Sequence, residues 1–282
     1  MFQTDLLKGK RALITGGGTG LGRSIGRRYL ELGASLVICG RRKEVLEATA
    51  SELSQQTGGK VTAIPCDVRD AAAVEAMMEQ IWREQPPDIL VNNAAGNFLA
   101  QTHKLSPRAI DSVLNIVLHG AAYCTVAAGR RWIEAQHKGV VLSILTLSAL
   151  NGAPFTVPSA MAKAGVLAMT KSLAVEWGSR GIRLVAVAPG PFPTPGAWQR
   201  LMPEQRSQGE PIENSIPLRR VGQHEELANL CSFLVSDQAG YINGDCVVID
   251  GGKMLQSGGG GANTSAMLDW SDDQWDALKP KK

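Results

Sequence analysis

The sequence lacks the features that mark secreted, membrane-spanning and metal-binding proteins. Its five cysteines lie far apart, without a CxxC pair or a Cys/His cluster, so we expect no metal site and free thiols in a reducing compartment. The first strand-like run begins within a dozen residues of Met1, which leaves no room for a signal or transit peptide. No apolar stretch approaches the roughly 20 residues that a membrane span needs. We therefore expect a cytoplasmic protein without a membrane partner.

An excess of charge of one sign is missing as well. The formal net charge is +3, and the basic residues are interleaved with acidic ones. This pattern gives no electrostatic footprint for a nucleic acid, so we expect no such partner. Aromatic residues make up 5% of the chain, but 44% of its 282 residues are hydrophobic. The chain is therefore long and apolar enough to bury a sizeable core.

Short apolar runs rich in Val, Ile and Leu alternate with amphipathic segments. The runs do not alternate polar and apolar residues, which is typical of a parallel sheet covered on both faces. The predicted strands are Arg11–Thr15, Ser35–Cys39, Val61–Ile64, Ile89–Val91, Val140–Ile144, Leu184–Val187 and Cys246–Ile249. The predicted helices are Leu21–Leu32, Lys43–Gln56, Ala71–Glu84, Arg108–Gln136, Ala160–Gly178 and Glu225–Val235. The alternation predicts βαβ units in a single doubly wound α/β domain, the Rossmann fold.

Two segments depart from this alternation. Residues 189–217 are rich in proline and polar residues and follow a strand, which predicts a mobile segment over the carboxyl edge of the sheet. Residues 256–265 contain four consecutive glycines and predict a flexible surface loop. Trp270 and Trp275 lie beyond it, and we expect them to attach the tail to the body or to a neighbouring subunit. We thus expect one domain over residues 1–282, with a core of about 8–252 and a C-terminal extension over 253–282.

Glycines cluster between the first predicted strand and the first predicted helix. Glycine suits this junction because the turn is tight and because a Cβ would keep the backbone away from a pyrophosphate. The helix that follows would direct free N–H groups and its positive dipole end at the phosphates. The candidate cofactor-binding residues of this turn are Gly16, Gly18, Thr19, Gly20, Leu21 and Gly22. The pattern indicates a dinucleotide site, with a purely structural turn as the alternative.

The residues after the second predicted strand indicate which dinucleotide binds. An acidic residue usually holds the free ribose 2′-OH of NAD at this place. Here Gly40, Arg41 and Arg42 follow the strand, without an acid. Because a guanidinium suits a 2′-phosphate, Arg41 favours NADP(H) as the cofactor. The alternative is a pair of solvated arginines at the start of a helix.

Three motifs resemble the short-chain dehydrogenase/reductase superfamily in register over about residues 8 to 252. They are Thr15–Gly22, Asn92–Gly96 and the Pro189-Gly190 pair after a late strand. The resemblance implies a seven-stranded parallel sheet and, usually, a homotetramer. It implies that Asp67 lies near the adenine and that Lys163 contacts the nicotinamide ribose. The remaining cofactor contacts that it implies are Asn93, Pro189, Gly190, Pro191 and Phe192.

The catalytic tyrosine of that superfamily is absent here. It normally stands four residues before the lysine, where this chain has Ser159 before Lys163. Val117 replaces the usual helix asparagine, and Thr146 the usual active-site serine. In carbonyl reduction a phenol beside a lysine protonates the nascent alkoxide, and a serine hydroxyl is a much poorer acid. Ordinary ketone and alcohol chemistry is therefore disfavoured.

One branch of the superfamily departs in this same way, and the chain resembles it: the NADPH-dependent 2,4-dienoyl-CoA reductases. The similar motifs are 66–70, 92–98, 158–165, 189–191 and, in the tail, 272–275. The resemblance implies that Asn97 holds the thioester carbonyl oxygen and that Ser159 and Lys163 are catalytic. Hydride addition to a conjugated thioester places charge on that oxygen, so hydrogen-bond donors can replace a strong acid.

The chain departs from this branch at Ser148, where the mitochondrial-type enzymes carry a second donor, a tyrosine. Ser148 is shorter and would need a bridging water, so we take it as a catalytic residue acting through that water. Thr146, two residues earlier on a predicted strand, is a reserve donor on the same face. His119 is a further candidate proton donor, with a purely structural role as the alternative.

The resemblance also implies substrate contacts. Arg69 and Arg200 match positions that contact the CoA part, and Phe98 is expected to line the acyl channel. Surface ion pairs for the arginines, and a core position for Phe98, are the alternatives. We therefore expect NADPH-dependent reduction of a conjugated unsaturated acyl-CoA, foremost 2,4-dienoyl-CoA to 3-enoyl-CoA in fatty-acid β-oxidation. The alternatives are a carbonyl or alcohol dehydrogenase and an NADPH-binding scaffold or sensor without turnover.

Overall fold

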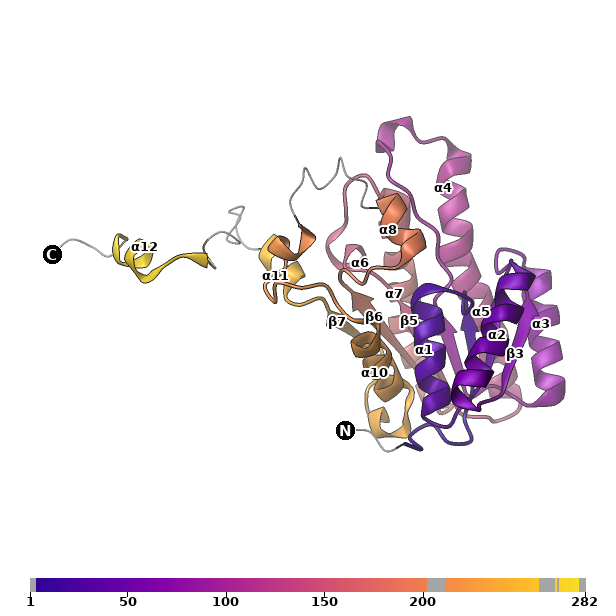
Figure 1. Ribbon diagram of the computed structural model, residues 1–282. Helices are drawn as coiled ribbons and strands as arrows, with labels where there is room; N and C mark the ends of the chain where they lie inside the picture. The colour runs from indigo at the N-terminus through magenta and orange to yellow at the C-terminus, as the bar shows by residue number, and fades with distance from the viewer. Residues whose placement is uncertain (1–3, 202–210, 259–266, 268, 279–282) are drawn as a thin grey trace.

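A seven-stranded parallel sheet forms the centre of the protein (Figure 1). The computed structural model describes residues 4–201, 211–258, 267 and 269–278. The strand order is β3-β2-β1-β4-β5-β6-β7. The strands are β1 (Arg11–Thr15), β2 (Ser35–Gly40), β3 (Val61–Pro65), β4 (Ile89–Asn92), β5 (Gly139–Ile144), β6 (Ile182–Pro189) and β7 (Cys246–Ile249). The order reverses between β1 and β4, and ligands of such sheets bind at the carboxyl ends of the strands beside this point.

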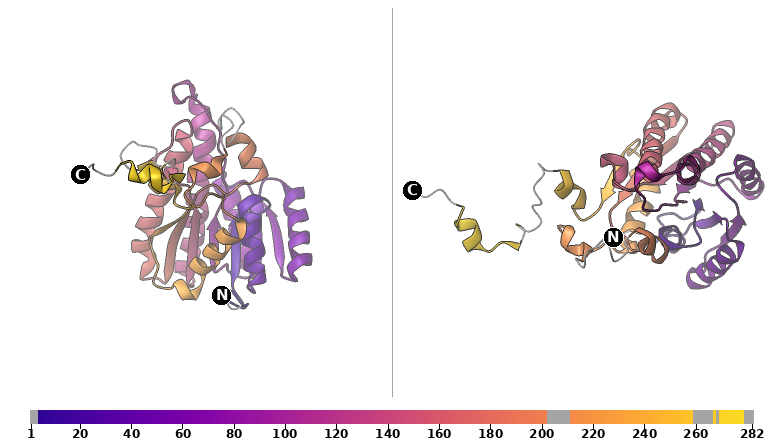
Figure 2. Two further views of the ribbon diagram at one scale, coloured as in Figure 1. Left: turned by 60° about the vertical axis from the view of Figure 1, so that its left-hand side comes forward. Right: turned by 90° about the horizontal axis from the view of Figure 1, so that it is seen from above.

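Helices cover both faces of the sheet (Figure 2). One face carries α1 (Gly20–Glu31), α2 (Lys43–Thr57) and α10 (His224–Val235). The other carries α3 (Ala71–Glu84), α5 (Gly120–Glu134) and α7 (Val157–Gly178). The shorter helices are α4 (Pro107–Leu114), α6 (Ser148–Asn151), α8 (Pro195–Leu201), α11 (Lys253–Gly258) and α12 (Asp272–Asp276). The doubly wound α/β fold expected from the alternation is confirmed.

The central strand shows why the apolar runs do not alternate. Successive side chains of a strand point to opposite faces of the sheet. Leu13 packs with the residues of α3 and α5, whereas Ile14 packs with those of α1 and α2. Both side chains are 0% exposed. Because each face of β1 is a core, a polar residue fits at neither position.

The predicted helix 108–136 is confirmed as one continuous helical run, Pro107–Glu134, with a π-helical turn inside it. A π-helical turn over Asn115–His119 separates α4 from α5. Ser106 caps α4 by accepting a hydrogen bond from the Ala109 N–H, and α5 begins at Gly120. A Cβ on Gly120 would lie 2.7 Å from a methyl carbon of Val68. The start of α5 therefore lies directly against the loop that follows β3.

This helical run, Pro107–Glu134, is the one helix in the described part of the chain that is long and apolar enough to cross a membrane. Half of its most apolar window is buried inside the fold. Cys124, Ala128 and Trp132 are 0% exposed and pack against the face of the sheet that α3, α5 and α7 cover. These contacts are those of a core helix in a globular protein.

The two irregular segments contain more structure than the composition predicts. Within residues 189–217 the structure forms α8 and a 3₁₀ turn, Ile212–Ser215, and residues 202–210 lie outside the described part. Of the predicted glycine loop, residues 256–258 belong to α11, and 259–265 also lie outside. The rings of Trp270 and Trp275 pack against each other, with centroids 5.0 Å apart, where the tail stands away from the body (Figure 1). Asp269 forms an ion pair of 2.5 Å with Arg219 of the body.

Candidate functional site

The glycine turn lies at the carboxyl end of β1, beside the point where the strand order reverses. Gly16 has φ +66° and Gly20 φ +54°, in the left-handed region that side chains avoid. A Cβ on Gly22 would lie 2.4 Å from Asn93 Nδ2 and 2.7 Å from the Gly16 carbonyl oxygen. Glycine is therefore required where α1 approaches β1 and β4, as predicted for a turn that receives a pyrophosphate.

Thr15 and Asn93 lock this turn to the end of β4. The Thr15 hydroxyl accepts hydrogen bonds from the N–H groups of Asn93 and Ala94, both at 3.0 Å. Asn93 Nδ2 donates to the carbonyl oxygens of Thr15 at 2.9 Å and Gly16 at 3.2 Å. The structure thus places Asn93 behind the turn, where it fixes the backbone. Sequence reasoning missed Thr15 in this role.

The N-terminus of α1 is open. Thr19, which precedes it, is extended at φ −152° and its side chain makes no capping hydrogen bond within the described residues. The first N–H groups of a helix have no partner in the helix itself. Gly20, Leu21 and Gly22 carry these groups at the mouth of the turn, while Thr49 holds Gly18 from behind by donating to its carbonyl oxygen at 2.8 Å. This arrangement fits a bound diphosphate.

Charged residues gather at the ends of β2 and β3. Arg41 directly follows β2, is exposed, and its side chain makes no ion pair or hydrogen bond to another described residue. Asp67 follows β3 and accepts hydrogen bonds from the Arg69 guanidinium at 2.5 to 3.0 Å. The Arg69 side chain, helped by the charge of Arg41, holds the pKa of Asp67 below its ordinary value. Arg69 thus forms an ion pair with Asp67, the alternative considered for it, close to Arg41 at the ends of β2 and β3.

Lys163 lies inside the protein on α7 and is 6% exposed. Its Nζ donates a hydrogen bond of 2.5 Å to the Ile144 carbonyl oxygen, where β5 ends. Burial lowers the pKa of Lys163 to about 8, because a charged ammonium loses its hydration there. A small cavity beside it is lined by Thr15, Asn92, Ile144 and Lys163. Lys163 therefore lies at the carboxyl edge of the sheet, next to the glycine turn.

Asn92 is a polar residue of this cavity that sequence reasoning did not single out. It is 5% exposed, and its Nδ2 donates to the Thr125 hydroxyl at 2.8 Å. Its Oδ1 is buried without a partner among the described residues. A polar residue at the end of the apolar strand β4 was the signal that could have identified it.

The low pKa of Lys163 predicts how the stability of the protein without nucleotide depends on pH. Between about pH 8 and 10.5 the folded protein loses the Lys163 proton while the unfolded chain keeps it. The unfolded state then binds more protons, so the free energy of unfolding rises through this window, by up to about 3 kcal/mol. Below pH 8 both states are charged, and the full cost of burial remains. Urea titrations at several pH values, compared with Lys163→Met, should show this rise in the wild-type protein and not in the variant.

Ser159 lies in the first turn of α7, and the loop after Asn97 contacts the residues just before this helix. Ser159 is 4% exposed and stands one helical turn before Lys163, on the same face. The loop that follows Asn97 is joined to the residues before α7 by a hydrogen bond of 2.9 Å from the Ala100 N–H to the Phe155 carbonyl oxygen. Asn97 Oδ1 accepts from the Phe98 N–H at 2.9 Å. The Asn97 amide N–H₂ is therefore the part of this side chain left to bind a substrate oxygen.

Phe98 packs in a small apolar cluster with Val113, Val117 and Ala162. This contact anchors the Asn97 loop to α4 and α7. Phe98 is therefore partly buried in the core, as the alternative for this residue expected. Val117 occupies the usual place of the superfamily asparagine and is 2% exposed in the same cluster. The cluster positions Asn97 without contributing a polar group.

Ser148 and Thr146 meet after β5. Their hydroxyl oxygens are 2.6 Å apart. The prediction that Thr146 lies on a strand was wrong, since β5 ends at Ile144 and Ser148 begins α6. The two hydroxyls meet through the turn between these elements, and α6 packs against α7. One of the two hydroxyls therefore donates a hydrogen bond to the other, near the start of α7.

His119 lies on the outer side of its helical turn. It is exposed, its Nδ1 is 2.9 Å from Asn115 Oδ1, and its ring lies 6.0 Å from that of Tyr123, measured between centroids. Val117 and Gly120 of the same run line the cavity of Lys163 instead. These positions support the structural role considered for His119 and do not support a role as proton donor.

The predicted segment Pro189–Phe192 lies at the carboxyl end of β6. The Gly190 N–H donates to the Ile249 carbonyl oxygen at 2.9 Å. A Cβ on Gly190 would lie 2.7 Å from Cβ of Asp250, so the segment runs flat against the end of β7. Phe192 is 9% exposed, with its ring against Gly222. Arg200 belongs to α8, and its side chain lies outside the described part of the structure.

The site can be compared with known proteins. The family described as enoyl-(acyl carrier protein) reductase matches residues 16–253. A probable 2,4-dienoyl-CoA reductase 3, (3E)-enoyl-CoA-producing, of Caenorhabditis elegans is 44% identical over 279 residues, covering 98% of this chain and 90% of that protein. A probable 2,4-dienoyl-CoA reductase, (2E)-enoyl-CoA-producing, of Bacillus subtilis is 43% identical over 248 residues, covering 87% and 97%.

Solved structures of short-chain dehydrogenases have the same fold as this chain. A crystal structure of a short chain dehydrogenase from Bacillus anthracis is 43% identical, has a TM-score of 0.78, and covers 86% of this chain and 96% of that one. Members of this superfamily are oxidoreductases that use a nicotinamide cofactor, NAD or NADP. The glycine turn, the open helix N-terminus and the buried Lys163 fit such a cofactor. The chain belongs to the short-chain dehydrogenase/reductase superfamily.

Proposed function

We propose that the protein is an NADPH-dependent reductase of conjugated unsaturated acyl-CoA, with 2,4-dienoyl-CoA as the foremost substrate and 3-enoyl-CoA as the product. One observation carries the proposal. Helix α7 carries a buried Lys163 and a serine where a catalytic phenol would stand, and the loop of Asn97, whose amide N–H₂ is a hydrogen-bond donor, packs against this helix through Phe98. Such a site can stabilise an oxyanion but lacks a strong acid for a carbonyl.

The residues of the site divide the work of this reaction. When bound, the nicotinamide supplies a hydride to the far end of the conjugated thioester. Negative charge then moves to the thioester oxygen as a dienolate, and Asn97 Nδ2 stabilises it by donating a hydrogen bond. The Thr146–Ser148 hydroxyl pair supplies a second donor, through a water where Ser148 is too short. Lys163 positions the cofactor, Ser159 orders the site, and a proton from water completes the product at carbon.

The names of the relatives support the substrate but differ on the product. The relative from C. elegans is named for a (3E)-enoyl product and that from B. subtilis for a (2E)-enoyl product. Protonation of the dienolate next to the thioester gives the 3-enoyl product, which we propose here as a step of β-oxidation. A substrate panel tests this choice: dienoyl-CoA should be reduced, and ketones and 3-oxoacyl thioesters should not. Turnover of ketones alone would instead establish a carbonyl dehydrogenase.

NADPH is favoured over NADH by Arg41. Its exposed guanidinium stands at the end of β2 without a hydrogen bond or ion pair to another described residue, where the ribose 2′-phosphate would lie. Arg41→Ala should raise the KM for NADPH about 10- to 100-fold, from the loss of a charge-assisted hydrogen bond. The KM for NADH should change little, because a free 2′-OH offers this side chain no charge. Steady-state kinetics with both nucleotides check this, and equal changes would refute the assignment.

We propose a homotetramer in a reducing compartment such as the cytoplasm. The outer faces of α5 and α7 expose apolar residues, with Val126 at 50%, Met161 at 52% and Val175 at 86%. Exposed apolar groups on neighbouring helices suit a subunit interface. The five cysteines are free, which fits reducing conditions. Light scattering should give four chain masses.

A further inference from the structure

Beyond the Gly190 N–H, which bonds to Ile249, the segment Pro189–Pro195 is held in place through its carbonyl oxygens. Every second residue in it is a proline, which has no N–H to donate. Its carbonyl oxygens instead accept from residues at the start of α10. The Gly222 N–H donates to the Pro191 carbonyl oxygen at 2.9 Å, and His224 Nε2 donates to that of Pro193 at 2.8 Å. His224 is thus a side-chain anchor of this segment.

The anchored segment touches the cofactor turn. A Cβ on Gly20 would lie 3.3 Å from the methyl carbon of Thr194, which is closer than an ordinary van der Waals contact. Gly20 begins α1 and carries one of the open N–H groups that fit a diphosphate. The position of Thr194 relative to Gly20 therefore decides how much room a diphosphate has at this helix end.

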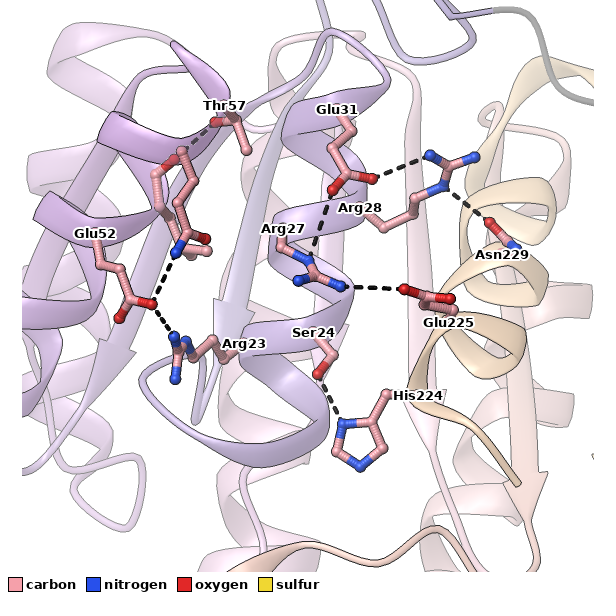
Figure 3. Close-up of polar contacts among 12 residues, drawn as sticks. Arg23, Ser24, Arg27, Arg28, Glu31, Glu52, Thr57, His224, Glu225 and Asn229 are labelled. Carbon is pink, nitrogen blue, oxygen red and sulfur yellow. Dashed lines mark hydrogen bonds and ion pairs between the residues drawn. The ribbon is translucent and has the colours of Figure 1, made fainter. Parts of the chain in front are cut away.

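His224 also reaches the helix of the cofactor turn (Figure 3). Its Nδ1 is 2.8 Å from the hydroxyl oxygen of Ser24, in the second turn of α1. Because the Pro193 carbonyl can only accept, Nε2 carries a proton. Nδ1 then accepts from the Ser24 hydroxyl in a neutral ring, or donates to it in a charged one. The imidazole therefore joins α1, α10 and the proline-rich segment in either charge state.

The other polar contacts between α1 and α10 join the two helices alone. Arg28 Nε donates to Asn229 Oδ1 at 2.8 Å, and Arg27 forms an ion pair of 3.6 Å with Glu225 (Figure 3). Asn229 lies more than one turn further along α10 than His224. The same helix interface thus contains a histidine that contacts the proline-rich segment and an asparagine whose hydrogen bond ends on Arg28. Replacing Asn229 should therefore weaken the packing of α1 against α10 alone, whereas replacing His224 should also release the proline-rich segment.

We propose that His224 is a positioning residue for the nicotinamide cofactor: by bridging Ser24 and the Pro193 carbonyl, it holds the Pro189–Pro195 segment against the glycine turn. The identity of the cofactor in this inference rests on the proposed function. Without the bridge the segment leaves the turn part of the time, and binding of the cofactor must restore it. The apparent affinity falls by the fraction of molecules in which the segment is displaced.

The test compares His224→Ala with Asn229→Ala in the full-length protein. The dissociation constant of NADPH is measured from its fluorescence without acyl-CoA, and thermal unfolding reports stability without nucleotide. His224→Ala should raise the dissociation constant about 3- to 10-fold, because one hydrogen bond of ordinary strength is lost. Asn229→Ala should lower stability to a similar degree and leave the dissociation constant within about twofold of the wild-type value. In turnover, His224→Ala should raise the KM for NADPH and change kcat by less than about twofold.

Two further variants separate the contacts of the imidazole. His224→Gln keeps an N–H that can reach the Pro193 carbonyl, so its dissociation constant should return to within about twofold of wild type. Ser24→Ala should have a smaller effect than His224→Ala. The double variant should bind NADPH as His224→Ala does, because Ser24 acts through the imidazole.

The outcomes distinguish this inference from the proposed function. If wild type binds NADPH but His224→Ala binds it equally well, or no worse than Asn229→Ala, the inference is wrong and the proposed function stands. If wild type binds NADH instead, the same comparison is made with NADH. That result would refute only the proposed specificity for NADPH. If wild type binds neither nucleotide, the proposed function is wrong, and the inference falls with it.

Discussion

Replacing Asn97 with alanine is expected to lower kcat on dienoyl-CoA by about 10²–10³-fold, with a much smaller change in KM. The fall follows from the loss of one donor aimed at the oxygen where charge develops, which costs about this factor in oxyanion sites. Asn97 suits this role because its Oδ1 is occupied by the Phe98 N–H, which leaves Nδ2 for the substrate. Steady-state kinetics with NADPH and dienoyl-CoA measure both parameters.

Two further variants make this result interpretable. Asn97→Asp keeps an acceptor for the Phe98 N–H and so keeps the local backbone, but it places a negative charge where the enolate forms. It should be impaired at least as strongly as Asn97→Ala. Gln101→Ala removes an exposed amide from the same loop and should leave kcat unchanged. A kcat for both Asn97 variants within about threefold of wild type would mean that another group binds the thioester oxygen.

Replacing Lys163 with methionine is expected to reduce kcat/KM at least about 100-fold. The ammonium would donate charge-assisted hydrogen bonds to the nicotinamide ribose, each contributing about 1.5–3 kcal/mol. Methionine has a similar length and suits a side chain that is 6% exposed. The folded structure should therefore persist while both cofactor affinity and turnover fall. Nucleotide binding and steady-state rates measured on one preparation separate the two effects.

The control for this variant lies on the same helix. Lys171 is exposed two turns further along α7, and Lys171→Met removes the same charge and should leave kcat/KM unchanged. An enzyme loses turnover when Lys163 is replaced, whereas an NADPH sensor has no turnover to lose. Wild-type activity in Lys163→Met would show that the buried ammonium has a structural role alone.

The sequence predicted those parts of the fold in which neighbouring residues of the chain record the structural requirement. Strand β1 is readable because Leu13 and Ile14 enter two cores, and a continuous apolar run records this. The glycines of the first turn are readable because left-handed backbone and close approach restrict the residue type. The π-helical turn before Gly120 was not readable, because the apolar periodicity of the helix continues through it.

The candidate site shows the same division. Lys163, Asn97 and Ser159 were predicted from a family resemblance, through motifs whose spacing is fixed by one helix or one loop. The contact of the Thr146 and Ser148 hydroxyls depends on where β5 ends, which a composition pattern does not set. His224 was not found, because it meets Ser24 across 200 positions of sequence and meets a backbone carbonyl that has no side-chain signature.

The path of the hydride distinguishes a dienoyl-CoA reductase from a carbonyl dehydrogenase. A single turnover of 2,4-dienoyl-CoA with NADPH deuterated at the transferred position can be analysed by NMR of the acyl product. We expect loss of the dienoyl absorbance, a 3-enoyl-CoA product, and deuterium at carbon 5, the far end of the conjugated system. No reduction of any dienoyl- or enoyl-CoA despite tight NADPH binding, or deuterium on a carbonyl carbon of a reduced ketone instead, would contradict the proposed function.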